Sequence, residues 1–305
     1  MEQILITGVA GFIGSHVAKK FLDEGYYVIG IDDLSQGNPK NIPSNVDFIE
    51  YDLSKGNLNK ILPKRCSKIL HLAGQSSGEI SFDNPIADLK KNTFSTLNLI
   101  QYGIEAKAER LIFASSMSVY GNVIDSGVNE SLTPIPLSCY GVGKLAAEQY
   151  LRIYHNKLPY VSMRMFNVYG PGQDMMNLRQ GMVSIYVSQA ISKKEIIVKG
   201  GLNRFRDFIY IDDVVESWYR ATFDNRAINH NINIATGVRT TVQEILNEIC
   251  KQIPGSTFKV EGNTPGDQNG IYADISLMKE VLSFSPEIEI NAGLNSFINW
   301  ALLEN

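Results

Sequence analysis

The chain has 305 residues, of which 44% are hydrophobic and 20% charged. These are ordinary globular proportions, and they exclude a disordered, collagen-like or coiled-coil chain. At roughly 150 residues per domain, the length suggests about two domains. The formal net charge is −4, and no block of five or more like charges occurs. Nucleic acid is therefore not an expected partner.

The cysteines and histidines predict neither disulfides nor a metal site. Cys66, Cys139 and Cys250 stand far apart, and their odd number argues against a disulfide framework or a structural zinc. The four histidines show no paired metal-binding spacing, so we expect no metal. The first residues lack the pattern of a signal peptide, and no apolar run approaches 18 residues. We expect no membrane association and a cytoplasmic, reducing location.

The first half of the chain alternates short β-branched runs with longer helical patterns. This alternation is typical of βαβ units and of a parallel sheet covered on both faces. The predicted strands are 3–7, 27–32, 46–51, 68–72, 110–115 and 160–166, and the predicted helices are 12–24, 58–62, 85–106 and 138–156.

After Asn167 the alternation becomes irregular, beginning at the turn cluster YGPGQ. A strand at 195–198 is predicted there, and a strand at 208–211, a helix at 212–222 and a strand at 232–234 indicate a return to the sheet. We therefore predict a sheet domain of residues 1–166, to which 208–235 return. A smaller lobe would comprise 167–207 and 236–305. Open α/β sheets bind ligands at the carboxyl ends of their strands, so the active site should lie between the lobes.

A glycine-rich turn follows the first predicted strand and opens the first predicted helix. Such glycines permit a tight turn and close approach of the backbone to a pyrophosphate, and the helix N-terminus favours the anion. The alternative is a glycine-rich turn that binds no ligand. The predicted cofactor-binding residues in the turn TGVAGFIG are Gly8, Gly11, Phe12, Ile13 and Gly14.

Asp32 ends the second predicted strand, 18 residues after Gly14. A carboxylate at this place can accept hydrogen bonds from the ribose hydroxyls of the adenosine. It would repel a 2′-phosphate, as would Asp33, so NAD is favoured over NADP. The alternative role for Asp32 is simply to cap a turn.

Together with the pair Asp52-Leu53 and the sequence HLAG at 71–74, these features resemble the extended short-chain dehydrogenase/reductase superfamily over nearly the whole chain. The resemblance implies an α/β fold: a Rossmann-type doubly wound parallel sheet with a smaller, interleaved C-terminal substrate lobe. It also implies NAD as cofactor. The further cofactor contacts that it implies are Asp52, Leu53, Leu72, Ala73, Gly74 and Asn92. For Asn92 the alternative is a polar residue on a helix surface, and His71 is interpreted as a hydrogen-bonded histidine at a strand end.

Tyr140 and Lys144 are four residues apart at the start of a predicted helix, so they project from one face. A neighbouring ammonium and an oxidised nicotinamide favour the phenolate, which would make Tyr140 a general base and place both side chains beside the cofactor. By resemblance, Ser116 holds the substrate hydroxyl and completes a Ser-Tyr-Lys triad. The alternatives are a chance pair on a helix surface for Tyr140 and Lys144, and a turn-capping serine for Ser116.

The residues after Ser116 separate the reactions that the superfamily catalyses. Nucleotide-sugar 4,6-dehydratases carry an Asp-Glu pair where this chain has Met117 and Ser118, and UDP-glucuronate decarboxylases have a glutamate at the position of Ser118. The sequence SSMSVYG is instead similar to UDP-hexose 4-epimerases. Redox chemistry without elimination is therefore favoured.

The second lobe carries residues that resemble the family's nucleotide-sugar site. Asn167 lies in RMFNVYGP and Arg206 in RDFIYIDDV, which match segments that contact the diphosphate-sugar. An arginine pairing with Asp207 or Asp213 is the alternative for Arg206. The family's later Arg-x-Gly-Asp motif reads Thr264-Pro-Gly-Asp here, so one phosphate-binding arginine is missing. Arg204 is a possible substitute, its alternative being a solvated loop charge. Cys139 has no role that we can derive.

These features predict an NAD-dependent nucleotide-sugar 4-epimerase of the UDP-glucose or UDP-N-acetylglucosamine type, which works through a transient 4-keto sugar. The resemblance also implies a homodimer. The alternatives are an epimerase acting at another carbon, a 4-keto-sugar reductase, a decarboxylase of the same superfamily and a non-catalytic dinucleotide-sensing protein. The sequence does not specify the sugar or the nucleotide.

Overall fold

The computed structural model describes residues 2–123, 127–262 and 270–304. Its centre is a seven-stranded parallel sheet of order β11-β6-β5-β4-β1-β2-β3. The strands of this sheet are β1 (Gln3–Thr7), β2 (Tyr27–Asp32), β3 (Asp47–Glu50), β4 (Lys68–His71), β5 (Arg110–Ser116), β6 (Tyr160–Met165) and β11 (His230–Ile234). This is the predicted α/β doubly wound architecture.

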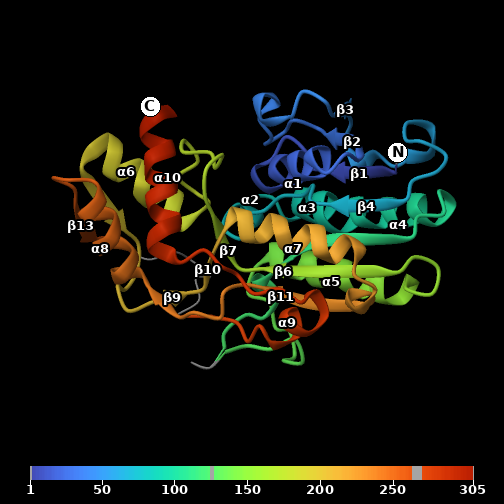
Figure 1. The fold of residues 1–305 in the computed structure, drawn as a ribbon. Helices are drawn as coiled ribbons and strands as arrows, with labels where there is room; N and C mark the ends of the chain where they lie inside the picture. The colour runs from blue at the N-terminus through green and yellow to red at the C-terminus, as the bar shows by residue number, and fades with distance from the viewer. Residues whose placement is uncertain (1, 124–126, 263–269, 305) are drawn as a thin grey trace.

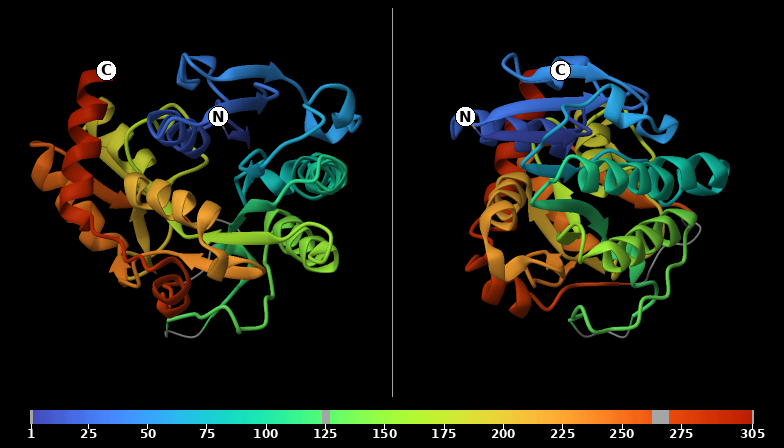
Figure 2. Two further views of the ribbon diagram at one scale, coloured as in Figure 1. Left: turned by 45° about the vertical axis from the view of Figure 1, so that its right-hand side comes forward. Right: turned by 90° about the vertical axis from the view of Figure 1, so that its right-hand side faces the viewer.

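Helices cover both faces of the sheet because its strands are apolar on both sides. Ile4 and Ile6 of β1 pack with α1 and α7, whereas Leu5 between them packs with α4 and α5. Figure 2 shows these two pairs of helices on opposite faces. The helices of this part are α1 (Phe12–Asp23), α2 (Ile80–Asp83), α3 (Pro85–Leu89), α4 (Ser95–Glu105), α5 (Cys139–Tyr154), α7 (Ile211–Phe223) and α9 (Ser276–Leu282).

A smaller group of helices and two-stranded sheets lies apart from the main sheet, at the left of Figure 1. Its apolar core includes Val187 of α6, Ile245 of α8 and Phe297 of α10. The elements are β7 (Asn167–Tyr169), α6 (Met182–Lys193), β8 (Glu195–Val198), β9 (Phe205–Arg206), β10 (Phe208–Tyr210), β12 (Thr240–Thr241), α8 (Val242–Gln252), β13 (Thr257–Val260) and α10 (Ile290–Glu304).

Three predicted elements differ from the structure by more than the placement of an end. The helix predicted at 58–62 is a single 3₁₀ turn, Leu58–Lys60. The helix predicted at 85–106 is interrupted, because Lys90–Phe94 forms a π-helical turn between α3 and α4. The strand predicted at 208–211 ends one residue earlier, as β10, and pairs with β7 in a separate two-stranded sheet. By contrast, the predicted strand at 232–234 is part of β11, which pairs with β6 in the main sheet.

Candidate active site

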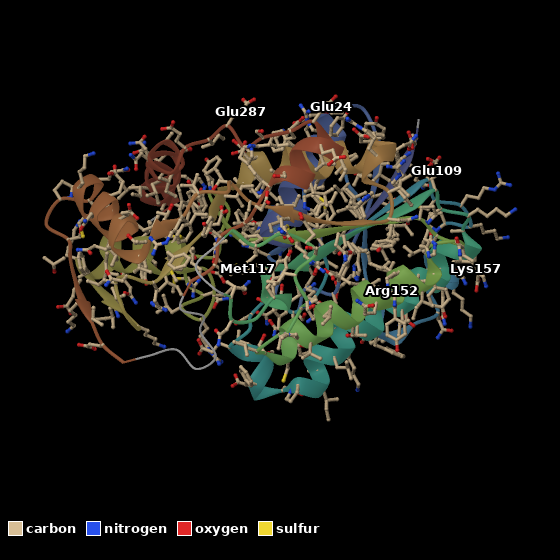
Figure 3. The ribbon with its side chains drawn as sticks, turned by 90° about the horizontal axis from the view of Figure 1, so that it is seen from below. Glu24, Glu109, Met117, Arg152, Lys157 and Glu287 are labelled. Atoms are coloured by element: carbon tan, nitrogen blue, oxygen red, sulfur yellow. The ribbon has the colours of Figure 1, made fainter. Side chains whose placement is uncertain are left out.

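A cleft of about 490 Å³ opens at the carboxyl ends of the sheet strands. Figure 3 shows the two ends of β5: Met117, just after its carboxyl end, lies near the middle of the molecule, whereas Glu109, just before its amino end, lies at the outer edge. The sequence-predicted residues that line the cleft are Gly8, Gly11, Phe12, Ile13, Gly14, Asp32, Asp52, Leu53, Leu72, Ala73, Gly74, Tyr140 and Lys144.

The glycine turn brings the end of β1 against the end of β4. Gly8 adopts a φ of +73°, and a Cβ there would lie 2.6 Å from the Ala73 nitrogen. A Cβ at Gly14 would collide with the Gly8 carbonyl. Gly11 is the N-cap of α1 and has no side chain with which to cap it, and the first turn carries no acidic residue. The turn therefore fits a pyrophosphate, which the free N–H groups of the helix N-terminus can bind.

Asp32 caps a turn, as its alternative interpretation expected, and its carboxylate also faces the cleft. The carboxylate accepts hydrogen bonds from the backbone N–H groups of Ala10, at 3.0 Å, and Leu34, at 2.9 Å. Burial raises its pKa, and the two backbone hydrogen bonds oppose that rise. Since each carboxylate oxygen can accept two hydrogen bonds, capacity remains for ribose hydroxyls.

Lys91 is a cleft residue that the sequence analysis missed. Its ammonium contacts Asp33 and also Asp52, at 3.0 Å from the latter's Oδ2. Burial works against the ionisation of both carboxylates, but the hydrogen bonds from Lys91 bring the net pKa of each below its usual range. Lys91 therefore joins the end of β2 to the segment after β3, and it partly neutralises the acids that flank Asp32.

Asn92 is fully buried in the π-helical turn, so it is not the helix-surface residue of the alternative interpretation. A Cβ at Gly74 would lie 2.6 Å from Asn92 Oδ1, which places the amide directly behind this cleft-lining glycine. Its Nδ2 donates to Asp88 Oδ1 at 3.1 Å. His71 is also fully buried, and its two ring nitrogens bond to the hydroxyls of Thr7 and Thr96.

The structure brings Ser116, Tyr140 and Lys144 together. Ser138 caps α5, and its hydroxyl accepts from the Gly141 N–H at 3.1 Å, so Tyr140 and Lys144 fall in the first turns of the helix. Lys144 Nζ lies 5.6 Å from the centroid of the Tyr140 ring. Burial raises the pKa of Tyr140 to about 12, and a hydrogen bond with the Ser116 side chain opposes this. Burial lowers the pKa of Lys144 to about 8.

Ser116 is also a capping residue, as its alternative interpretation expected. Its hydroxyl accepts from the Ser118 N–H at 3.1 Å, at the start of a short 3₁₀ turn. The neighbouring Ser115 faces the other way and donates to Glu148 at 2.6 Å. Successive strand residues point to opposite faces of the sheet, so Ser116 and Ser115 contact different parts of α5. Ser116 bonds to Tyr140, and Ser115 bonds to Glu148.

The predicted substrate residues Ser116, Asn167, Arg204 and Arg206 are not among the residues that line the cleft. Asn167 Nδ2 donates to the Asp207 carbonyl at 3.0 Å and approaches Met117 Sδ at 3.6 Å. Arg204 is buried, so it is not a solvated loop charge, and its guanidinium donates to the carbonyls of Gly201 and Lys199.

Arg206 is only 3% exposed. Burial lowers its pKa to about 10, with a further contribution from the nearby Arg204 guanidinium. The carboxylates of Asp207 and Asp213 both accept from backbone N–H groups, among them those of Gly237 and Glu287. Thr264 lies outside the described residues. Cys139 is the first residue of α5 and is partly exposed.

A segment of the smaller lobe also reaches the cleft, which the sequence did not reveal. Asp174, Asn177 and Gln180 line it. Between the last two, Arg179 bonds to Glu79 at 3.0 Å and to Asp83 at 2.8 Å, and Gln180 donates to Ser76 at 2.7 Å. Long loops carry no periodic pattern, so the only signal was the turn cluster YGPGQ that precedes this segment.

The doubly wound sheet, the glycine turn and the buried tyrosine-lysine pair define a dinucleotide-dependent enzyme of the short-chain dehydrogenase/reductase type. Residues 4–235 match the family described as NAD dependent epimerase/dehydratase family, and the chain belongs to that family. NAD is therefore its cofactor.

Two curated relatives cover nearly the whole chain. The chain is 33% identical over 304 residues to a putative UDP-glucose 4-epimerase of Methanocaldococcus jannaschii, with 98% of each chain covered. It is 31% identical to UDP-glucuronic acid decarboxylase 6 of Arabidopsis thaliana, covering 96% of this chain and 86% of the relative.

Solved structures of UDP-sugar epimerases have the same fold. The UDP-glucose 4-epimerase of Thermotoga maritima, solved with UDP-glucose, has a TM-score of 0.94 at 31% identity and 99% coverage of both chains. The UDP-glucuronic acid 4-epimerase of Bacillus cereus, solved with UDP-glucuronic acid and NAD, has a TM-score of 0.92 at 29% identity, covering 99% of this chain and all of that one.

No helix among the described residues is long and apolar enough to cross a membrane. In the same residues, His, Cys, Asp and Glu side chains form no cluster of three or more that could hold a metal ion.

Proposed function

We propose that the protein is an NAD-dependent nucleotide-sugar 4-epimerase acting on a UDP-sugar of the UDP-glucose or UDP-N-acetylglucosamine type. The observation that carries the proposal is the gathering of Ser116, Tyr140 and Lys144, the last two of which line the cleft. Met117 and Ser118 follow Ser116, where other members of the superfamily carry an acid-base pair. Tyr140 can exchange a proton with a sugar hydroxyl, but neither Met117 nor Ser118 carries a carboxylate to assist elimination.

In the proposed reaction, the Tyr140 phenolate removes the proton from the sugar hydroxyl. Ser116 orients that hydroxyl, and Lys144 stabilises the phenolate. NAD, when bound, supplies the acceptor for the hydride from the same carbon and returns it. The 4-keto sugar rotates within the site, so the hydride returns to its other face and Tyr140 returns the proton. The cofactor is regenerated in each cycle.

The charge environment of Tyr140 supports this role. Without a ligand, burial raises its pKa to about 12, which makes it a poor base near neutral pH. A cationic nicotinamide beside it would favour the phenolate and lower that pKa, as would protonation of Lys144. The base would thus be activated most fully when the oxidised cofactor is bound and Lys144 is protonated.

Arg204 and Arg206 support the binding of a nucleotide diphosphate. Both are buried, and the charge of Arg204 lowers the pKa of Arg206, so the two cations lie close enough to repel each other. Burying like charges together is costly, and a diphosphate can relieve that cost through charge-assisted hydrogen bonds. Asn167 would contact the same diphosphate-sugar.

The principal alternative is decarboxylation of a UDP-uronate, because a decarboxylase is among the 31% identical relatives. Ser118 argues against it, since the glutamate found in those enzymes at this position is missing. Incubation with a panel of UDP-, GDP-, CDP- and dTDP-sugars without added reductant, followed by NMR and mass spectrometry, tests both reactions. A product of unchanged mass supports epimerisation. A loss of about 44 mass units, the weight of CO2, shows decarboxylation.

The homodimer is part of the proposal, and it would form through residues 85–106, which include α3, the π-helical turn and α4, and through residues 138–156, which include α5. In Figure 2, α4 and α5 lie side by side. The large apolar side chains exposed on α3, α5 and the π-helical turn are Ile86, Leu89, Phe94, Val142, Tyr150 and Ile153. Exposed apolar patches commonly mark such interfaces. Ile153→Glu should give a monomer in light scattering, whereas Leu303→Glu, at a more exposed leucine near the C-terminus, should not. A dimer that survives Ile153→Glu contradicts this interface.

We also propose the two-lobe division and a cytoplasmic location. The pairing of β11 with β6 supports the return of 208–235 to the domain of residues 1–166. The separate apolar core of α6, α8 and α10 supports a substrate lobe of 167–207 and 236–305. All three cysteines are free, which suits a reducing compartment.

A further inference from the structure

Asp88 is a buried carboxylate that the proposed reaction does not use. It lies in α3 and is only 2% exposed. Its Oδ1 accepts from Gln75 Nε2 at 2.9 Å and from Asn92 Nδ2 at 3.1 Å. Its Oδ2 is buried and has no hydrogen-bond partner among the described residues. Such an oxygen is costly in a protein interior, so its placement calls for a charge nearby.

The unpaired oxygen faces α5 at the residue before Lys144. A Cβ at Gly143 would lie 3.3 Å from Asp88 Oδ2, so a larger side chain would crowd the carboxylate. The hydroxyl of Thr93 donates to the Gly143 carbonyl at 3.0 Å and fixes the two helices at this point. The helix that carries Lys144 is thus held closely against Asp88.

Lys144 is buried, and its ammonium lies against the aromatic rings of Phe113 and Tyr140. It is 3% exposed, and its Nζ lies 5.0 Å from the centroid of the Phe113 ring. Burial lowers its pKa to about 8, and the charge of Asp88 opposes that fall. His71 also lies near Lys144, but burial lowers the pKa of its ring to about 3, so it is neutral.

The other charged groups on these elements are engaged elsewhere. Lys91, on the turn after Asp88, pairs with Asp33 and Asp52. Glu148, one helical turn beyond Lys144, pairs with Arg164. A cationic nicotinamide would add a second positive charge to the site. The negative charge that can balance the two comes from Asp88.

We propose that Asp88 is the counter-ion of Lys144, a positioning residue that keeps the proton on Lys144 so that Tyr140 can exist as the phenolate. The inference rests on the proposed Tyr140 and Lys144 pair. The arrangement of Tyr140 phenolate with Lys144 ammonium contains the same number of protons as the arrangement of Tyr140 phenol with Lys144 amine. Solution pH therefore cannot choose between the two arrangements, but a fixed charge can.

Under this proposal, the charge of Asp88 acts more strongly on Lys144 than on Tyr140, and this difference is what the experiment below tests. The charge of Asp88 is the leading influence that favours the proton on Lys144. It also raises the pKa of Tyr140, but less than burial does, and less than the Ser116 hydrogen bond lowers it. Removing its charge should shift the pair toward phenol with amine. Removing the charge should also make the fully protonated pair, phenol with ammonium, lose its first proton at lower pH. The reason is that the anion that favoured retention of that proton is gone.

Asp88→Asn removes this charge with little change in shape. The asparagine Oδ1 can still accept from Gln75 and Asn92, and its Nδ2 replaces the oxygen that has no partner. Asp88→Ser is a second uncharged variant. The matched control is Asp23→Asn, which removes a 59% exposed carboxylate on α1. Circular dichroism and NAD binding establish that each variant folds.

The decisive measurement needs no sugar. Tyrosinate absorbance of the NAD-bound protein is titrated with pH, and the signal of Tyr140→Phe is subtracted to isolate Tyr140. Asp88→Asn should lower the apparent pKa for loss of the first proton by about one unit. It should also reduce the phenolate signal on the plateau that follows that step about three- to tenfold, whereas Asp23→Asn should do neither. With substrate, the plateau of kcat should fall by a similar factor, with its acid limb moved to lower pH.

An unchanged titration in a folded Asp88→Asn complex, or a shift to higher pH, overturns the counter-ion role. A fall in kcat without the shift also overturns it, because that result means a merely structural contribution. If no UDP-sugar is epimerised but the titration shifts as expected, the proposed function fails and the counter-ion role stands. The two ideas are therefore separable.

Discussion

At the scale of single residues, burial moves the pKa values of both Tyr140 and Lys144 in the direction that favours the neutral form. Burial raises the pKa of the phenol to about 12 and lowers that of the ammonium to about 8. The reactive ion pair therefore depends on nearby charges rather than on solvent. Such opposed shifts in one cleft are typical of acid-base sites.

Tyr140→Phe tests the base directly. The change removes one hydroxyl and leaves the ring packed, so the protein should fold and bind NAD as before. Turnover should fall at least about a hundredfold, the usual scale of general base catalysis. Steady-state kinetics with the substrate identified by NMR measure this. Activity within a few-fold of the parent would mean that another group carries the proton.

Asp32 sets the choice of dinucleotide. We expect NAD to bind at least about tenfold more tightly than NADP, because a 2′-phosphate would meet the Asp32 charge. Asp32→Ala should weaken NAD binding and narrow that preference. Calorimetry with both cofactors measures it, and equal affinities in the parent would contradict the assignment. Lys91 weakens the repulsion of a 2′-phosphate, because its ammonium partly neutralises the nearby carboxylates of Asp33 and Asp52.

At the scale of elements, α5 presents three polar residues at four-residue spacing. Tyr140 and Lys144 face the cleft, while Glu148 is buried against the sheet and makes a two-armed ion pair with Arg164 of β6. Ser115 of β5 donates to the same carboxylate. The reactive end of the helix is therefore fixed to two strands through Glu148.

Glu148→Gln should lower the free energy of unfolding by about 3 kcal/mol, because it leaves the buried Arg164 charge uncompensated. Chemical denaturation measures the change. The control Asp23→Asn breaks an exposed pair with Lys19 and should cost about 0.5 kcal/mol or less. If the two variants lose the same stability, the buried pair does not anchor the helix.

The sequence predicted most sheet elements because buried strands and capped helices leave local patterns. β1 and β2 were predicted with their observed bounds. The π-helical turn at Lys90–Phe94 was missed, since one inserted residue scarcely alters helical periodicity. β10 was assigned to the return to the sheet domain, but its partner is β7, and strand pairing is a tertiary property that a short apolar run does not encode.

The site was predictable only where a motif carries the chemistry. The glycine turn and the tyrosine-lysine spacing are such motifs, and their residues line one cleft. Asp88 and Lys91 act through contacts with residues distant in sequence, and no pattern in one chain marks them. Arg204 was given a role from its nearness to Arg206, but the structure also shows it bound to the carbonyls of its own turn.

At the scale of the whole molecule, the cleft is closed by a connection between its two parts. The segment 174–181 comes from the smaller lobe and contacts residues 76–83 of the sheet domain. Asp174, Asn177 and Gln180 of this segment line the cleft opposite the glycine turn. A cofactor that is regenerated in every cycle benefits from such closure, because it has no need to leave.

Arg179→Ala should therefore speed the release of NAD. Arg179 pairs with both Glu79 and Asp83, but these groups are substantially exposed, so each pair contributes little. We expect the NAD dissociation rate to rise about two- to fivefold, with the pKa of Tyr140 unchanged. Stopped-flow displacement by excess nucleotide measures this rate.

Salt should speed the release of NAD from the parent but hardly from the variant, since salt screens exposed pairs. The control Arg226→Ala removes an exposed pair with Asp224, away from the cleft, and should leave release unaltered. Equal rates and equal salt dependence in parent and Arg179→Ala would mean that the segment covers the cleft without retaining the cofactor.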